Sequence, residues 1–123
     1  LVHRTNLKTL KRMFVIVAKY LIPMGYSGMA LFPFILLKEQ RDVSNSIMLQ
    51  HEKIHLRQQL ELLILPFFIW YGIEYLIRIL QYKHKHLAYR NISFEREAYA
   101  NELQKNFLQK RRFWNFLNYL KVK

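Results

Sequence analysis

Apolar residues recur at close to helical spacing between Leu7 and Ile22, with basic residues on the other side. This pattern predicts an amphipathic basic helix, which either packs on the core or lies as an arm on a membrane surface. Pro23, Gly25 and Gly28 then end the helix and open a turn.

The stretch from Tyr20 to Leu37 has eighteen residues and no charge, which meets the lower limit for a membrane span. Its prolines and glycines make a poor helix, so Met29 to Leu37 are instead predicted to form one buried strand. Pro33 cannot donate a ladder hydrogen bond, which places this strand at a sheet edge or beside a bulge. An exposed edge could pair with an extended peptide, whereas a strand that only covers the core fits the pattern equally well. The candidate substrate-contacting residues are Leu31, Phe32, Pro33 and Phe34.

A second helix is predicted to begin between residues 43 and 47. Its N-cap candidates are Asp42, Ser44 and Ser46, and its apolar stripe consists of Leu49, Leu56, Leu60 and Leu63. From Leu62 to Ile73 the chain is apolar without a break, and Pro66 should kink or end the helix there. These twelve residues are short of a membrane span, so a buried core helix is favoured over membrane insertion.

Residues 82–120 are predicted to form a connector and two further helices. The segment from Tyr82 to Ile92 is predicted to be a connector whose His84 and His86 lie in solvent. Ser93 is a plausible cap for a third helix, with acidic residues in its favourable first turn. The tail from Phe107 to Leu120 has the apolar face of a further helix.

Composition narrows the class of protein. A chain of 123 residues is expected to form one domain, and 52% apolar with 15% aromatic residues excludes a disordered chain. The absence of cysteine excludes disulfides, thiolate zinc sites and cysteine nucleophiles. A net charge of +12 favours phosphates, anionic lipid headgroups or acidic partners. The compartment stays open between the cytoplasm and a membrane surface.

Candidate chemistry lies in the second helix, where His51, Glu52 and His55 form the pattern H-E-x-x-H. Residues four apart lie on one face of a helix, so the two imidazoles can bind one ion. Their nitrogens would be half of a tetrahedral zinc shell. Glu52 lies close enough to reach a water on that metal.

A catalytic zinc ion needs three protein ligands and one open position, and two histidines with a glutamate form one such set. On the third helix, Glu95 falls beside the apolar stripe and is the best third ligand, with Glu102 the second choice. Glu97 is predicted to point towards solvent. Alternatively, these acidic residues only stabilise the start of the helix.

These residues resemble the gluzincin metallopeptidases, whose signature is H-E-x-x-H followed by E-x-x-A-D. Residues 51–59 read H-E-x-x-H-x-x-Q-Q, and the sequence from Phe94 to Tyr99 is also similar to stretches in small, largely uncharacterised zinc-peptidase-like proteins. The resemblance covers roughly residues 20–105 and leaves both termini, a basic helical arm (1–19) and a basic aromatic helix (106–123), unmatched.

The resemblance implies an α+β, predominantly helical fold: an edge strand or small sheet, a zinc helix and a glutamate helix. It makes His51, His55 and Glu95 the Zn²⁺ ligands and Glu52 the general base in the hydrolysis of a peptide or protein substrate. The aspartate of the family signature is replaced by Tyr99, so support for the ligands must come from another group, such as Gln58, Asn101, Glu102 or Tyr99 itself.

Tyr99 is also the candidate donor to the oxyanion, because it lies one turn from Glu95 on the same face. Two other functions remain open. One is a scaffold that zinc stabilises without turnover. The other is a basic protein that binds an anionic membrane surface or, less in keeping with the sequence, nucleic acid through the aromatic and basic tail.

Overall fold

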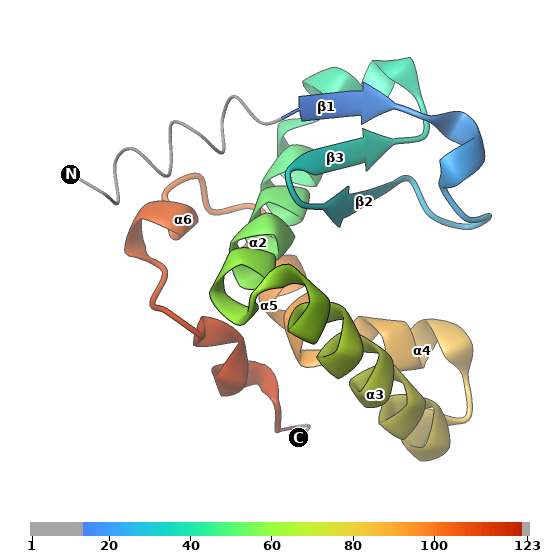
Figure 1. Cartoon of the computed structure of the whole chain (residues 1–123), viewed down its shortest axis with the longest axis vertical. Helices are drawn as coiled ribbons and strands as arrows, with labels where there is room; N and C mark the ends of the chain where they lie inside the picture. The colour runs from blue at the N-terminus through green and yellow to red at the C-terminus, as the bar shows by residue number, and fades with distance from the viewer. Residues whose placement is uncertain (1–13, 122–123) are drawn as a thin grey trace.

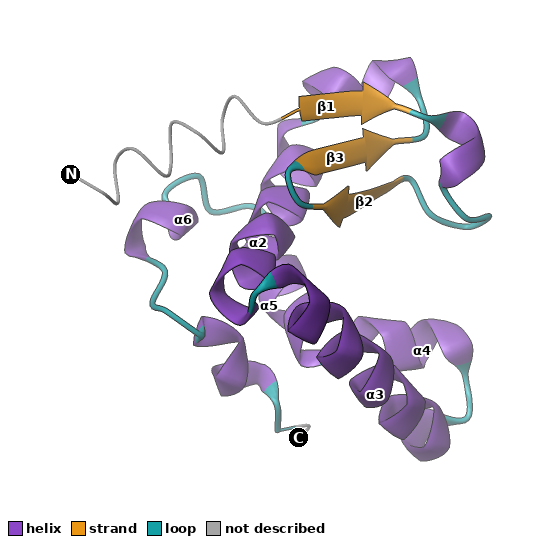
Figure 2. Ribbon diagram, in the orientation of Figure 1, coloured by secondary structure: helices purple, strands orange, loops and turns teal. Residues whose placement is uncertain are grey.

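A computed structural model of the chain describes residues 14–121. Its fold is α+β and predominantly helical, as the sequence predicts, with one small sheet beside a group of helices (Figures 1 and 2). The helices are α2 (Ser46–Leu62), α3 (Ile64–Tyr82), α4 (Lys85–Arg90), α5 (Ser93–Asn101) and α6 (Phe107–Lys110). Short 3-10 helices cover Lys19–Leu21, Gln40–Ser44 and Asn115–Tyr119.

The sheet contains β1 (Phe14–Val17), β2 (Gly28–Leu31) and β3 (Phe34–Leu37) in the order β1-β3-β2. β1 runs parallel to β3, and β2 runs antiparallel to β3 with Ala30 opposite Ile35. The prediction of one strand over Met29 to Leu37 is therefore wrong. Phe32 and Pro33 lie in a tight turn that reverses the chain, so the apolar run forms a hairpin whose β2 strand is at the sheet edge.

The predicted first helix is also corrected, because Phe14–Val17 form a strand. All four of these residues have β-branched or aromatic side chains that suit a pleated strand, and pairing with β3 decides their conformation. The part of the predicted helix before Phe14 lies outside the described residues.

α2 begins within the predicted window, and its N-cap is Asn45, whose side chain accepts a hydrogen bond from the Met48 amide. Its buried face differs from the predicted leucine stripe. Leu56 is fully buried, but Leu60 and Leu63 are 40% and 73% exposed. The buried face is largely polar instead, since it includes His51, Glu52, His55, Gln58 and Gln59.

The break after α2 lies at Leu63, which has a positive φ of 60°, and Pro66 fits in the first turn of α3. The prediction that this apolar segment is a buried core helix is wrong, because most of its aliphatic side chains are exposed. α3 is the one helix in the described part of the chain that is long and apolar enough to cross a membrane by length and composition. The predicted connector after it contains α4.

The predicted C-terminal helix is interrupted. α6 ends at Lys110, Arg111 is extended with a ψ of 131°, and a 3-10 helix follows at Asn115–Tyr119. The interruption turns the Arg111 side chain into the protein, where it binds two carboxylates.

The core has three parts that hold α2 and α5 in place. One lies between the sheet and α2, around Ile35, Leu37 and Leu56. A second joins α2 and α5 to α6 through Ile54, Ala98, Phe107 and Leu108. The third is aromatic and centres on Phe94 of α5, whose ring centroid is 4.5 Å from those of Phe67 and Phe116.

Gln59 joins the hairpin to α2, since its side chain accepts from the Phe32 amide (2.7 Å) and donates to the Ala30 carbonyl (2.9 Å). We expect Gln59→Ala to lower the free energy of unfolding by about 2 kcal/mol, because both backbone groups lose their partner. Urea unfolding measures this loss. Gln109→Ala, at an exposed site of α6, is the matched control and should change stability little; equal losses in the two variants would contradict the predicted role of Gln59.

Candidate metal centre

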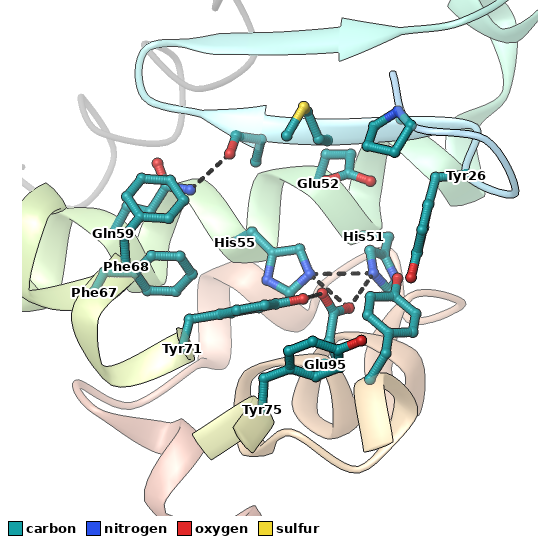
Figure 3. A pocket seen from close by; sticks show the side chains of 15 residues that line it. Tyr26, His51, Glu52, His55, Gln59, Phe67, Phe68, Tyr71, Tyr75 and Glu95 are labelled. Atoms are coloured by element: carbon teal, nitrogen blue, oxygen red, sulfur yellow. Dashed lines mark hydrogen bonds and ion pairs between the residues drawn. The ribbon is translucent and has the colours of Figure 1, made fainter. Parts of the chain in front are cut away.

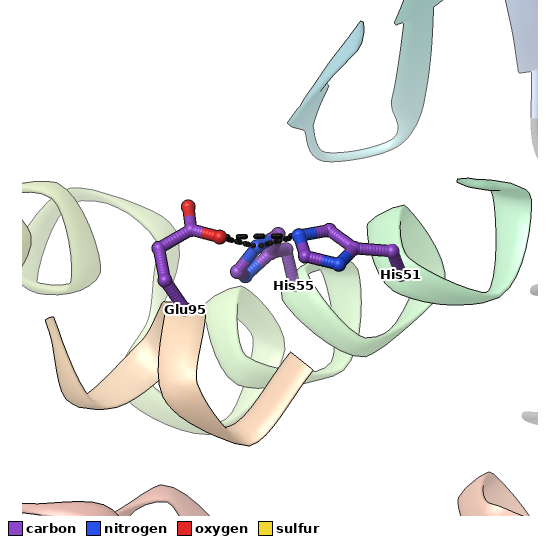
Figure 4. Close-up of side chains that lie close together, drawn as sticks. All are labelled: His51, His55 and Glu95. Atoms are coloured by element: carbon purple, nitrogen blue, oxygen red, sulfur yellow. Dashed lines mark hydrogen bonds and ion pairs between the residues drawn. The ribbon is translucent and has the colours of Figure 1, made fainter. Parts of the chain in front are cut away.

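His51, His55 and Glu95 converge at the contact between α2 and α5 (Figure 4). The two histidines project from successive turns of α2, and Glu95 comes from the first turn of α5. Glu95 Oε1 lies 3.1 Å from His51 Nε2 and 3.0 Å from His55 Nε2, and the two Nε2 atoms are 3.2 Å apart. The structure thus brings together the three residues that the sequence predicts as ligands.

The three atoms form a nearly equilateral triangle that fits a tetrahedral zinc ion. Ligand bonds of about 2.0 Å place neighbouring corners of a tetrahedron about 3.3 Å apart, and the observed edges are 3.0–3.2 Å. All three side chains are buried. The donor set of two imidazoles and one carboxylate leaves a fourth corner, as catalytic zinc sites require.

The outer atoms of the ligands are also held. Glu102 Oε1 lies 2.9 Å from His51 Nδ1, and Gln58 Oε1 lies 2.8 Å from His55 Nδ1. Both oxygens can accept a hydrogen bond from Nδ1–H, which leaves each Nε2 lone pair for a metal. Glu102 and Gln58 are therefore placed to hold the two imidazole rings in this orientation.

Tyr71 of α3 holds Glu95, a role that no motif in the sequence predicts. Its hydroxyl donates to Glu95 Oε2 at 2.6 Å, so that Oε1 faces the histidines. Only a tyrosine at helical spacing among apolar residues marks this position in the sequence, and such tyrosines more often belong to a core.

Glu97 is fully buried, so the prediction that it points to solvent is wrong. α5 is covered on two sides, by α2 and by the C-terminal segment, and a one-sided helical wheel could not show this. Glu97 accepts hydrogen bonds from Gln58 Nε2 (2.8 Å), Arg111 Nε (2.6 Å) and Asn115 Nδ2 (2.8 Å). A continuous chain of hydrogen bonds thus connects Arg111 through Glu97 and Gln58 to His55.

The start of α5 is held by Glu74 of α3 and not by the predicted Ser93 cap. The Glu74 carboxylate accepts from the Ser93 amide at 2.6 Å and from the Ser93 hydroxyl at 2.7 Å. A buried carboxylate at a helix N-terminus satisfies an unpaired amide and suits the helix dipole. Glu74 therefore fixes the turn that carries Glu95.

A cleft opens between β2 and α2 at the three ligands (Figure 3). One compartment, of about 280 Å³, is mainly aromatic, with Tyr26, Phe67, Phe68, Tyr71, Tyr75 and Tyr89 among its lining residues. A second compartment, of about 350 Å³, is more polar and also borders His51 and Glu52. The hairpin lines the cleft through Gly28, Met29 and Ala30.

The candidate substrate-contacting residues lie beyond these positions: Leu31 ends β2, Phe32 and Pro33 form the turn, and Phe34 begins β3. β2 is an outer strand of the sheet, as an added peptide strand would require. However, the strand residues that line the cleft are Gly28, Met29 and Ala30, which come immediately before the predicted ones in the chain. A Cβ at Gly28 would lie 3.1 Å from the Leu36 carbonyl oxygen, so glycine suits the close pairing of β2 with β3 at this position.

Glu52 borders both compartments of the cleft, next to His51. Burial raises the pKa of its carboxyl group, although His55 and His51 oppose this shift. Within residues 14–121, no hydrogen bond to the Glu52 carboxylate is found. A buried carboxylate with a raised pKa is suited to exchanging protons near neutral pH.

Tyr99 lines the polar compartment, where its ring packs edge-on against His51 with centroids 4.4 Å apart. Its hydroxyl lies 3.1 Å from that of Tyr89, which faces both compartments. His86 also lines the polar compartment and is exposed, whereas His84 Nδ1 accepts the Leu87 amide at the start of α4.

His55 and Glu95 form a charge pair in the metal-free protein. Burial lowers the pKa of the His55 imidazole, but the Glu95 carboxylate outweighs this effect and raises the pKa to about 9. Burial likewise acts to raise the pKa of Glu95, and the two histidines outweigh it, so that the pKa of Glu95 falls well below its ordinary value.

Comparison of the chain with models of protein families, with curated proteins and with solved structures finds no match. The case for a function therefore rests on the geometry of the site.

The charge pair predicts a pH dependence of the metal-free protein. The pKa of His55 is raised in the folded state. Its contribution to the free energy of unfolding is therefore complete below its ordinary pKa of 6.5 and is lost as the pH rises through about 9. Metal-free protein should therefore become less stable over this window, by up to about 3 kcal/mol. Urea unfolding in chelator at several pH values measures the loss. His55→Gln should flatten this part of the profile, and an unchanged profile would contradict the predicted pair.

Proposed function

We propose that the protein is a zinc-dependent peptidase with His51, His55 and Glu95 as the metal ligands. The observation that carries the proposal is the triangle of three donor atoms, 3.0–3.2 Å apart, whose outer atoms are each fixed by another side chain. The gluzincin-like spacing of these residues supports the same class of enzyme. When bound, zinc supplies Lewis acidity, which acidifies water and polarises a peptide carbonyl.

Glu52 is the general base of the proposed reaction. It lies beside the ligands, faces the cleft and has no competing hydrogen bond among the described residues. Its ionised form takes a proton from the attacking water, and its protonated form then passes that proton to the departing amine. The raised pKa brings the carboxyl group closer to the pH at which it can do both.

The substrate is a polypeptide segment that lies between β2 and α2. The outer position of β2 in the sheet leaves this strand available for pairing with an extended chain. Tyr89 and Tyr99 supply hydroxyl groups on the opposite side of the cleft, so either can donate to the oxygen that becomes negative during attack.

We expect purified protein to bind one zinc ion per chain. Glu95→Gln should lower zinc affinity by about tenfold or more, because an amide does not supply the negative charge of the carboxylate ligand. Competition with a chromogenic chelator measures the affinity. Glu39→Gln is the matched control away from the cleft and should bind zinc as the wild type does. Equal affinity of all three proteins would refute the ligand assignment.

Glu52→Gln should retain zinc and lose peptide hydrolysis by about 10²-fold or more, since the amide cannot accept the proton. A diverse peptide library, assayed with and without chelator, measures the turnover. Again Glu39→Gln should behave as the wild type. Wild-type protein that binds zinc tightly and cleaves no peptide would instead identify a zinc-stabilised scaffold.

A further inference from the structure

The side of α3 that faces away from the cleft is exposed and apolar. A helix on the surface of a water-soluble protein places its charges outward and its apolar residues inward. α3 has the reverse arrangement. Its outward stripe consists of Leu65, Ile69, Ile73, Leu76 and Leu80, which are 55–77% exposed. We call this stripe the outer face of α3.

The two charged residues of α3 point inward. Glu74 and Arg78 are 5% and 6% exposed, and they form an ion pair with a separation of 3.2 Å. Glu74 is engaged by Ser93, and Arg78 also donates to the Leu120 carbonyl at 2.7 Å. The outer face is therefore a continuous apolar surface without charge, of a kind that marks contact with a membrane or a protein.

A groove of about 450 Å³ lies beside the outer face, between α3 and the C-terminal segment. Ile69, Ile73 and Ile77 line it from α3, and Leu120 lines it from the other side. The paired side chains of Glu74 and Arg78 also line the groove. The exposed surface beside α3 is thus mainly apolar and wider than one helix, which suits insertion among acyl chains.

We infer that the outer face of α3 binds the surface of an anionic lipid bilayer, with the helix parallel to the membrane. Charge favours this occupant over a second protein. The chain carries +12, and exposed Lys83 and Lys85 follow α3 directly, while exposed Lys121 follows the Leu120 side of the groove. Cations at the margins of an apolar surface match anionic headgroups around an apolar interior.

The inner side of α3 determines this orientation. The helix is 19 residues or about 28 Å long, close to the thickness of the hydrocarbon core. However, its inner side binds Glu95 through Tyr71 and the start of α5 through Glu74, so it stays attached to the domain. A helix fixed along one side can insert only the other side. The inference does not depend on the proposed peptidase activity, although it would place the cleft close to the membrane surface.

Sedimentation with phosphatidylcholine vesicles tests the inference, with and without about 30% phosphatidylglycerol. The wild type should bind the anionic vesicles at least about tenfold more tightly than the neutral ones, and added salt should weaken the binding. Leu76→Glu combined with Leu80→Glu should lower binding by at least about tenfold. Leu21→Glu combined with Leu103→Glu is the matched control, since these leucines are 65% and 73% exposed outside α3. Circular dichroism and zinc content report whether each variant is folded.

The lack of cysteine allows a second measurement with single-cysteine variants that carry an environment-sensitive fluorophore. A probe at Leu80→Cys should shift to the blue when anionic vesicles are added, and a probe at Leu103→Cys should not. A probe at position 80 that is already shielded in buffer and unchanged by vesicles would overturn the inference. A dimer, detected by analytical ultracentrifugation, that Leu76→Glu combined with Leu80→Glu dissociates would also overturn the inference.

Discussion

The structure depends on one contact, at which the first turn of α5 is held against the polar face of α2. Glu95 reaches the two histidines only if this contact is fixed to within a fraction of an ångström, and three polar groups inside a protein are costly unless their other atoms are satisfied. Each ligand therefore has its own partner: Glu102 for His51, Gln58 for His55 and Tyr71 for Glu95. The site is a buried polar network that the apolar core surrounds.

The network extends to segments that are distant in sequence and brings them to the same contact. Glu74 fixes the start of α5 from α3, and Arg111 fixes its middle from the C-terminal segment through Glu97. Arg96 also donates to the Tyr119 carbonyl. Truncation of the chain before Arg111 would leave the Glu97 carboxylate buried without its countercharge, which is more costly than removal of the whole ion pair. The C-terminal segment thus helps to hold the candidate metal centre, although it places no side chain among the three converging residues.

The sequence was sufficient to predict that His51, His55 and Glu95 lie together and insufficient to predict what surrounds them. The spacing of His51 and His55 specifies their shared face because helical geometry is local, and the position of Glu95 could be inferred from the side of its helix. The burial of Glu97 could not be inferred, because it depends on Arg111, which is fourteen residues later in the chain. Arg111 binds Glu97 only because the predicted C-terminal helix is interrupted at this residue. The sequence pattern did not predict the hairpin, because Pro33 is compatible with one strand at a sheet edge or beside a bulge, whereas it lies in the turn. The segment of α3 was predicted to be a buried core helix because it is apolar, but an apolar composition does not show which side chains face solvent.

α3 combines two constraints that are normally met by different helices. Its inner side supplies polar groups to the buried contact with α5, namely Tyr71 to Glu95 and Glu74 to Ser93, so its charges cannot face outward as well. The aliphatic residues are consequently left on the outside, where water makes them unfavourable. An apolar environment on that side removes this cost and keeps the inner groups in place. The same helix therefore connects the candidate metal centre to its own outer face, because Tyr71 on its inner side holds Glu95.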